Sequence, residues 1–74
     1  MRKYLKVMRL LKDLSQKDLS NKLSISQSYY SAIEKGRKQK DMSLSLVERL
    51  AIVFDTSVEE IWEKENSYLK LKNK

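Results

Sequence analysis

The 74-residue chain contains no cysteine and no histidine. These absences exclude a disulfide framework and a zinc site of the usual cysteine and histidine type. They also leave the chain without a thiol nucleophile or an imidazole base, and no other residues form a convincing reactive constellation. We therefore expect a protein that is not an enzyme and that uses no metal and no cofactor.

Proline is also absent, and Gly36 is the only glycine. Apolar residues recur with helical spacing in five segments, which indicates an all-α fold. The predicted helices are residues 3–12, a two-turn segment capped by Ser15, residues 27–35, a segment capped by Ser43 that runs through Phe54, and a last one that Ser57 caps. Residues 1–65 are expected to form one domain, and residues 66–74 a tail or an extension of the fifth helix.

The net charge of +6 is unevenly distributed. Residues 1–40 hold 11 basic and three acidic residues, whereas residues 41–74 hold five and seven. A basic half on a small domain favours nucleic-acid binding, because phosphates attract Lys and Arg; a solvated basic surface is the alternative. Charges interrupt the apolar residues of the start too often for a signal peptide or a membrane span. The expected location is the cytoplasm, with no membrane partner.

Two short helices joined by a three-residue turn are typical of a helix-turn-helix. The stretch LSQKDLSNKLSISQSYYSAIEKG, residues 14–36, has buried-type residues where two such helices meet. Together with Arg9, SLSLVERLAIVF and SVEEIW, it resembles the lambda-repressor/Cro-like (XRE) family over residues 5–62. This resemblance implies a compact five-helix lambda-repressor-like domain, whose second and third helices form the helix-turn-helix.

The chain departs from the family pattern at a few positions. Ser24 in the turn and Asp13 after the first helix stand where the family usually has glycine, and Ser tolerates a left-handed backbone less well than Asp. Ser20 replaces a small Ala, so its hydroxyl needs a partner if it is buried. The family's common proline after the basic loop is missing, and this loop looks about two residues longer.

The third helix is expected to read DNA bases. On a helical wheel Tyr30 and Ile33 share one side, while the other side is small and polar, which suits the major groove. Gln27 at its start can form the paired hydrogen bonds that distinguish adenine. By the family resemblance, the base-reading residues are Gln27, Ser28, Ser31 and Ala32. For Gln27 the alternative is an exposed amide without a ligand.

A second group of residues is expected to contact DNA phosphates. Gln16 and Lys17 begin the second helix, where free N–H groups and the helix dipole favour an anion. Tyr29 lies at the edge of the buried side, so its hydroxyl either reaches a phosphate or merely packs. The remaining candidates form the basic run after the third helix: Lys35, Arg37, Lys38 and Lys40. Such runs are often only solvated.

Two further contacts concern structure and assembly. The resemblance implies that Arg9 pairs with Glu34 and ties the first helix to the end of the third. Trp62, Tyr68 and Leu69 are surplus apolar residues, which we expect to form a symmetric homodimer contact. The alternative is that the tail folds back on the first helix of its own chain.

The resulting functional prediction is a sequence-specific transcriptional regulator that binds double-stranded DNA, with no evident small-molecule ligand. Family habit suggests a repressor of phage or mobile-element type, whose third helix enters the major groove of a near-palindromic operator. The alternatives are an antitoxin that binds a toxin protein and autoregulates its operon, or a restriction-system controller protein.

Overall fold

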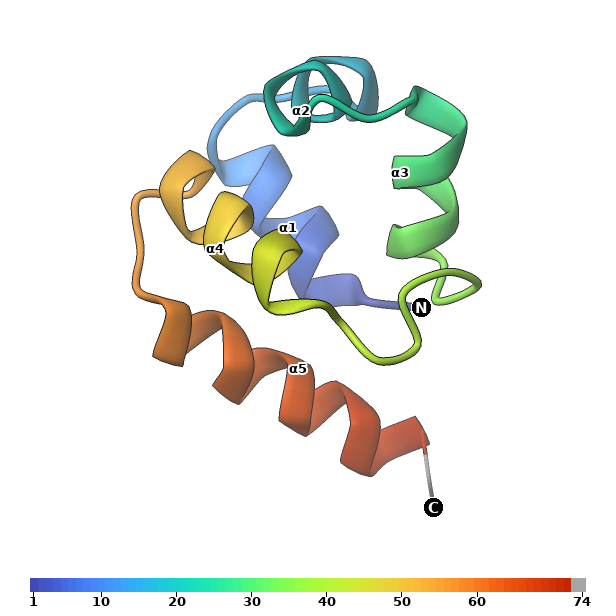
Figure 1. The fold of residues 1–74 in the computed structure, drawn as a ribbon, viewed down its shortest axis with the longest axis vertical. Helices are drawn as coiled ribbons and strands as arrows, with labels where there is room; N and C mark the ends of the chain where they lie inside the picture. Colours follow the sequence, from blue (N-terminus) through green and yellow to red (C-terminus); the bar gives the residue numbers. More distant parts are fainter. Residues whose placement is uncertain (73–74) are drawn as a thin grey trace.

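A computed structural model describes residues 1–72 and has five helices and no strand in that range (Figure 1). The helices are α1 (Lys3–Leu11), α2 (Gln16–Leu23), α3 (Gln27–Glu34), α4 (Leu44–Val53) and α5 (Val58–Lys72). The prediction of an all-α, five-helix fold is confirmed. α1, α3 and α4 each end one residue earlier than expected.

Serine side chains set where four of the helices begin. The hydroxyls of Ser15, Ser26, Ser43 and Ser57 each accept a hydrogen bond from the backbone N–H three residues later, at 3.0–3.1 Å. Each bond satisfies one of the N–H groups that the first turn of a helix leaves unpaired. The four expected start points are therefore explained by local chemistry.

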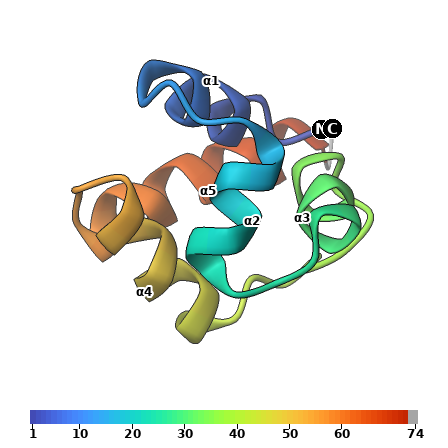
Figure 2. The ribbon, with the colours of Figure 1, turned by 90° about the horizontal axis from the view of Figure 1, so that it is seen from above.

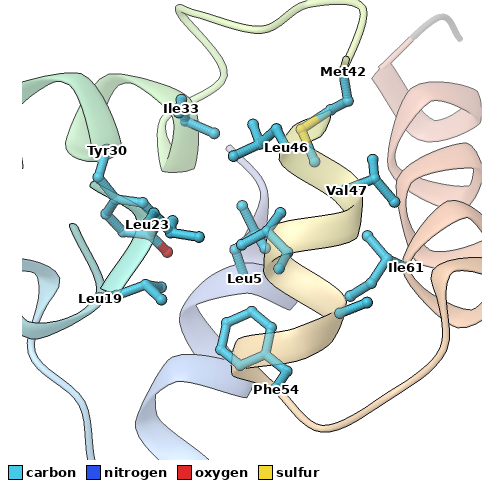
Figure 3. Packing of buried hydrophobic residues seen from close by; sticks show 12 residues of the cluster. Leu5, Leu19, Leu23, Tyr30, Ile33, Met42, Leu46, Val47, Phe54 and Ile61 are labelled. Atoms are coloured by element: carbon cyan, nitrogen blue, oxygen red, sulfur yellow. The ribbon is translucent and has the colours of Figure 1, made fainter. Parts of the chain in front are cut away.

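Buried side chains from all five helices meet in one core, much of it arranged along α4 (Figure 3). Leu5 of α1, Leu19 of α2, Ile33 of α3, Val47 of α4 and Ile61 of α5 are completely buried. Leu44 of α4 is apolar as well, but it is 58% exposed. It occupies the first position of α4.

α5 lies along one side of the molecule and continues without a break to Lys72. Residues 66–72 thus extend the fifth helix. The start of the chain lies beside the loop that follows α3 (Figure 1), where the Arg2 N–H donates to the Glu34 carbonyl at 2.7 Å. Within residues 1–72, no helix combines the length and the apolar character that crossing a bilayer requires.

Candidate nucleic-acid interface

In the turn between α2 and α3, Ser24 adopts the left-handed backbone for which the family usually has a glycine. Ser24 has φ 59° and ψ 41°, and Asp13 after α1 has φ 56°. The Ile25 N–H donates to the Ser20 carbonyl at 3.0 Å, which closes the end of α2. Ser20 is buried, and its hydroxyl donates to the Lys17 carbonyl at 2.8 Å. The fold therefore accommodates both serines. The Ser20 hydroxyl has a hydrogen-bond partner, whereas the left-handed backbone of Ser24 costs free energy.

α3 lies at the outer edge of the molecule (Figure 2), with one side buried and one side free. Tyr30 and Ile33 are fully buried, as the helical wheel predicted. The predicted base-reading residues lie on the remaining surface: Gln27 and Ser28 are exposed, while Ser31 and Ala32 are partly exposed. Small side chains on this surface leave room for close approach to a groove about 12 Å wide.

An ion pair connects the end of α3 to α1. Arg9 Nε and Nη2 donate to the two carboxylate oxygens of Glu34, each at 3.2 Å, and both side chains are buried. Arg9 also donates to the Leu14 carbonyl at 3.0 Å. The hydrogen bond to Glu34 raises the pKa of the Arg9 guanidinium above its ordinary value, against the smaller opposing effect of burial. This pair fixes the orientation of α3.

The N-terminus of α2 offers two backbone donors. Ser15 and Asp18 form a capping box, in which the Ser15 N–H donates to the Asp18 carboxylate at 3.0 Å. This backbone hydrogen bond lowers the pKa of Asp18. The box uses the N–H of Asp18, so those of Gln16 and Lys17 remain for an outside anion. Lys17 is exposed and Gln16 partly exposed.

The basic loop after α3 presents its cations to solvent. Gly36 has φ 83°, and the Arg37 N–H donates to the Ala32 carbonyl at 2.8 Å. The four candidate phosphate contacts around this loop, Lys35, Arg37, Lys38 and Lys40, are all exposed. These cations place positive charge beside the C-terminal end of α3.

Tyr29 is held by this loop. Its partly buried hydroxyl accepts a hydrogen bond from Gln39 Nε2 at 2.8 Å, and Gln39 Oε1 accepts one from the Ser43 N–H at 3.1 Å. A phenol can accept and donate at once, so the Tyr29 proton stays available for a phosphate oxygen. Packing and phosphate contact are therefore compatible for this residue.

Arg2, which no pattern in the sequence singles out, is fully buried. Its guanidinium donates to both carboxylate oxygens of Glu65, each at 2.9 Å, and to three backbone carbonyls. Burial alone would lower the pKa of Arg2, but the hydrogen bond and charge of Glu65 raise it. Tyr4 donates to Glu65 at 2.6 Å, and burial followed by this bond raises the Tyr4 pKa far above its usual range. No sequence signal joins residues that are 63 positions apart.

The expected dimer residues on α5 are only partly exposed. Tyr68 covers Arg2, with 5.1 Å between the guanidinium carbon and the ring centroid. This part of α5 therefore packs against the start of its own chain. Trp62 packs against the core and Leu69 is partly buried, whereas Leu71 remains 71% exposed.

Comparisons with known proteins agree with this geometry. A family model described as Helix-turn-helix matches residues 5–61. The chain is 40% identical over 62 residues to an uncharacterized HTH-type transcriptional regulator of Methanocaldococcus jannaschii, a match that covers 84% of this chain and 91% of that protein. No solved structure gives a significant match.

Proposed function

Since the chain belongs to the helix-turn-helix family of DNA-binding transcriptional regulators, we propose that it is a repressor that recognises a specific operator. Its third helix lies in the major groove, and occupation of the site blocks transcription. A regulator of phage or mobile-element type fits this small domain. The observation that carries the proposal is the outward side of α3, which the chain's own atoms leave uncovered around Gln27 and Ser28.

Gln27 is the principal base-reading residue in this proposal. Its amide stands at the first position of α3, and a Gln side chain can pair with N6 and N7 of adenine. Ser28, Ser31 and Ala32 add closer, less selective contacts, because a hydroxyl pairs with several bases and a methyl group touches only thymine. Selectivity is therefore concentrated at the base that Gln27 reads.

Phosphate contacts on both sides of α3 hold the helix in register. Gln16 and Lys17 contact phosphate at the N-terminus of α2. Residues 35–40 contribute four cations, and Tyr29 lies beside them. These contacts orient the protein without reading sequence. They also make the affinity fall steeply as salt is raised.

The repressor acts as a homodimer on a near-palindromic site. Leu71 and Met1, at 71% and 54% exposed, are apolar side chains that a second copy of α5 would cover, with Trp62, Tyr68 and Leu69 alongside. Two-fold symmetry then spaces two copies of α3 by one DNA turn, about 34–36 Å. Sedimentation over a concentration series tests this arrangement, and a monomer at every micromolar concentration contradicts it.

Selection of bound sequences from random duplexes tests the proposed function and reports the symmetry of the site. On the selected duplex, Gln27→Ala is expected to cost about 1–3 kcal/mol and to relax preference at one base pair. Asn21→Ala is the matched control, because it removes an exposed amide from α2 at a position with no proposed DNA or dimer contact. Equal weakening on all duplexes would show that Gln27 reads no base, and the lack of any preferred duplex would refute the operator-binding proposal.

A further inference from the structure

We propose that Arg2 and Glu65 are positioning residues for DNA binding, which hold the basic loop of residues 36–40 in the shape that contacts phosphates. This inference rests on the proposed function and assigns part of it to α5, an element that contributes no predicted DNA contact. It differs from the role of the Arg9–Glu34 pair, which holds α3 itself.

The guanidinium of Arg2 connects three parts of the chain. It donates to the Ile33 carbonyl at 2.7 Å, near the end of α3, and to the Lys38 carbonyl at 3.0 Å and the Gln39 carbonyl in the loop. Its other bonds go to Glu65 on α5. One rigid, planar group therefore sets the position of the loop relative to both helices, which a lysine with a single ammonium cannot do.

Residues of α5 and α1 hold Arg2 in position. Glu65 is completely buried, and its carboxylate accepts hydrogen bonds from two guanidinium nitrogens of Arg2 and from the Tyr4 hydroxyl. The Tyr68 ring covers the guanidinium, and its hydroxyl fills the space over Gly36 so closely that a Cβ there would collide with it. Gly36 and Tyr68 thus fit α5 directly against the start of the loop.

The loop needs such an anchor because it has no regular secondary structure of its own. Gln39 adopts φ 57°, a left-handed backbone that costs free energy for a residue with a side chain. Without Arg2 the loop keeps the hydrogen bonds of Arg37 and of the Gln39 side chain, but its backbone at Lys38 and Gln39 loses three-way support. DNA would then have to order this part of the loop on binding. Held by Arg2, the exposed cations Arg37, Lys38 and Lys40 already stand in place.

The test is the double variant Arg2→Met with Glu65→Leu, which leaves the net charge unchanged and removes both buried charges. Such replacements of a buried ion pair by apolar residues often preserve the fold. We expect its affinity for the selected duplex to fall about tenfold, since ordering one loop residue costs about this factor. The base preference at Gln27 should stay unchanged.

A double-mutant cycle separates positioning from a general loss of structure. In a background with Arg37→Ala, Lys38→Ala and Lys40→Ala the backbone carbonyls remain but the loop cations are gone. There the Arg2→Met, Glu65→Leu change should weaken binding by less than about twofold, because it acts through those cations. An equal loss in both backgrounds, or no loss in either, would overturn the inference.

A second comparison removes one negative charge at a time. It keeps the inference testable if the Arg2→Met, Glu65→Leu variant fails to fold. Glu65→Gln and Glu63→Gln each make the chain more positive by one, which by itself favours DNA. Glu63 is exposed, so its variant should bind as well as the native chain or slightly better. Glu65→Gln, assayed below its own unfolding temperature, should bind more weakly, and equal binding by the two variants would refute the inference. A native chain without a preferred duplex contradicts the proposed function instead.

Discussion

Removing the Arg9 guanidinium should destabilise the fold far more than removing both members of its pair. In Arg9→Met the apolar stem is kept, but Glu34, 2% exposed, loses its only ion-pair partner in residues 1–72. Breaking a buried pair from one side costs about 3–5 kcal/mol. Arg9 keeps 8% exposure, which favours the lower end. The whole domain is worth only about 4–11 kcal/mol at typical values per residue, so a large share of its stability is at stake.

The assay is thermal and urea unfolding of the native chain, Arg9→Met, Glu34→Leu and the double variant, followed by circular dichroism. A loss of about 3 kcal/mol lowers the Tm of a domain this size by about 12 °C or more. In the double variant no charge is left unpaired, so the expected loss is about 1 kcal/mol, from the missing bond to the Leu14 carbonyl. Single effects that simply add up to the double effect would refute the reasoning.

The other predictions concern the turn between α2 and α3, the cap of α3 and the hydroxyls of Tyr4 and Tyr30. Ser24→Gly should raise the free energy of unfolding by about 1 kcal/mol, since glycine adopts the left-handed backbone without strain. Ser26→Ala should lower it by about the same amount, because it removes the cap of α3. Urea midpoints of the two variants that shift in the same direction would contradict this. Tyr4 and Tyr30 have pKa values raised chiefly by burial above the ordinary 10.0, so above that pH the unfolded chain releases protons that the native chain keeps. The free energy of unfolding should therefore fall as pH rises, by up to about 1.4 kcal/mol per pH unit for each tyrosine. Tyr4→Phe or Tyr30→Phe should weaken the pH dependence of the urea midpoint between about pH 9 and 11.

Much of the fold could be predicted because the responsible interactions are local. A serine hydroxyl caps an N–H three residues away, so Ser15, Ser26 and Ser43 mark helix starts without any tertiary information. Helical periodicity likewise separates the buried Tyr30 from the exposed Gln27. The surface of α3 that is proposed to read DNA follows directly from this separation.

Other features of the site depend on residues that meet only after folding. Periodicity alone does not show that Leu44 of α4 stays exposed, because an apolar residue at a helix start is buried only if another element covers it. The bond between Tyr29 and Gln39 depends on the path of an irregular loop. The interaction of α5 with the chain's own start, through Tyr68 and Arg2, likewise depends on how far the fifth helix continues.

The amino-acid sequence alone determined five helices, the capped starts of four of them, the buried side of α3 and a basic half, since propensity, capping and charge act over a few residues. Only the tertiary structure decided that Arg2 leaves solvent and joins Glu65 to the carbonyls of the basic loop. A lone arginine and a lone glutamate carry no mutual signal along the chain. Their burial becomes favourable only when folding brings together enough acceptors to compensate the lost hydration of both charges.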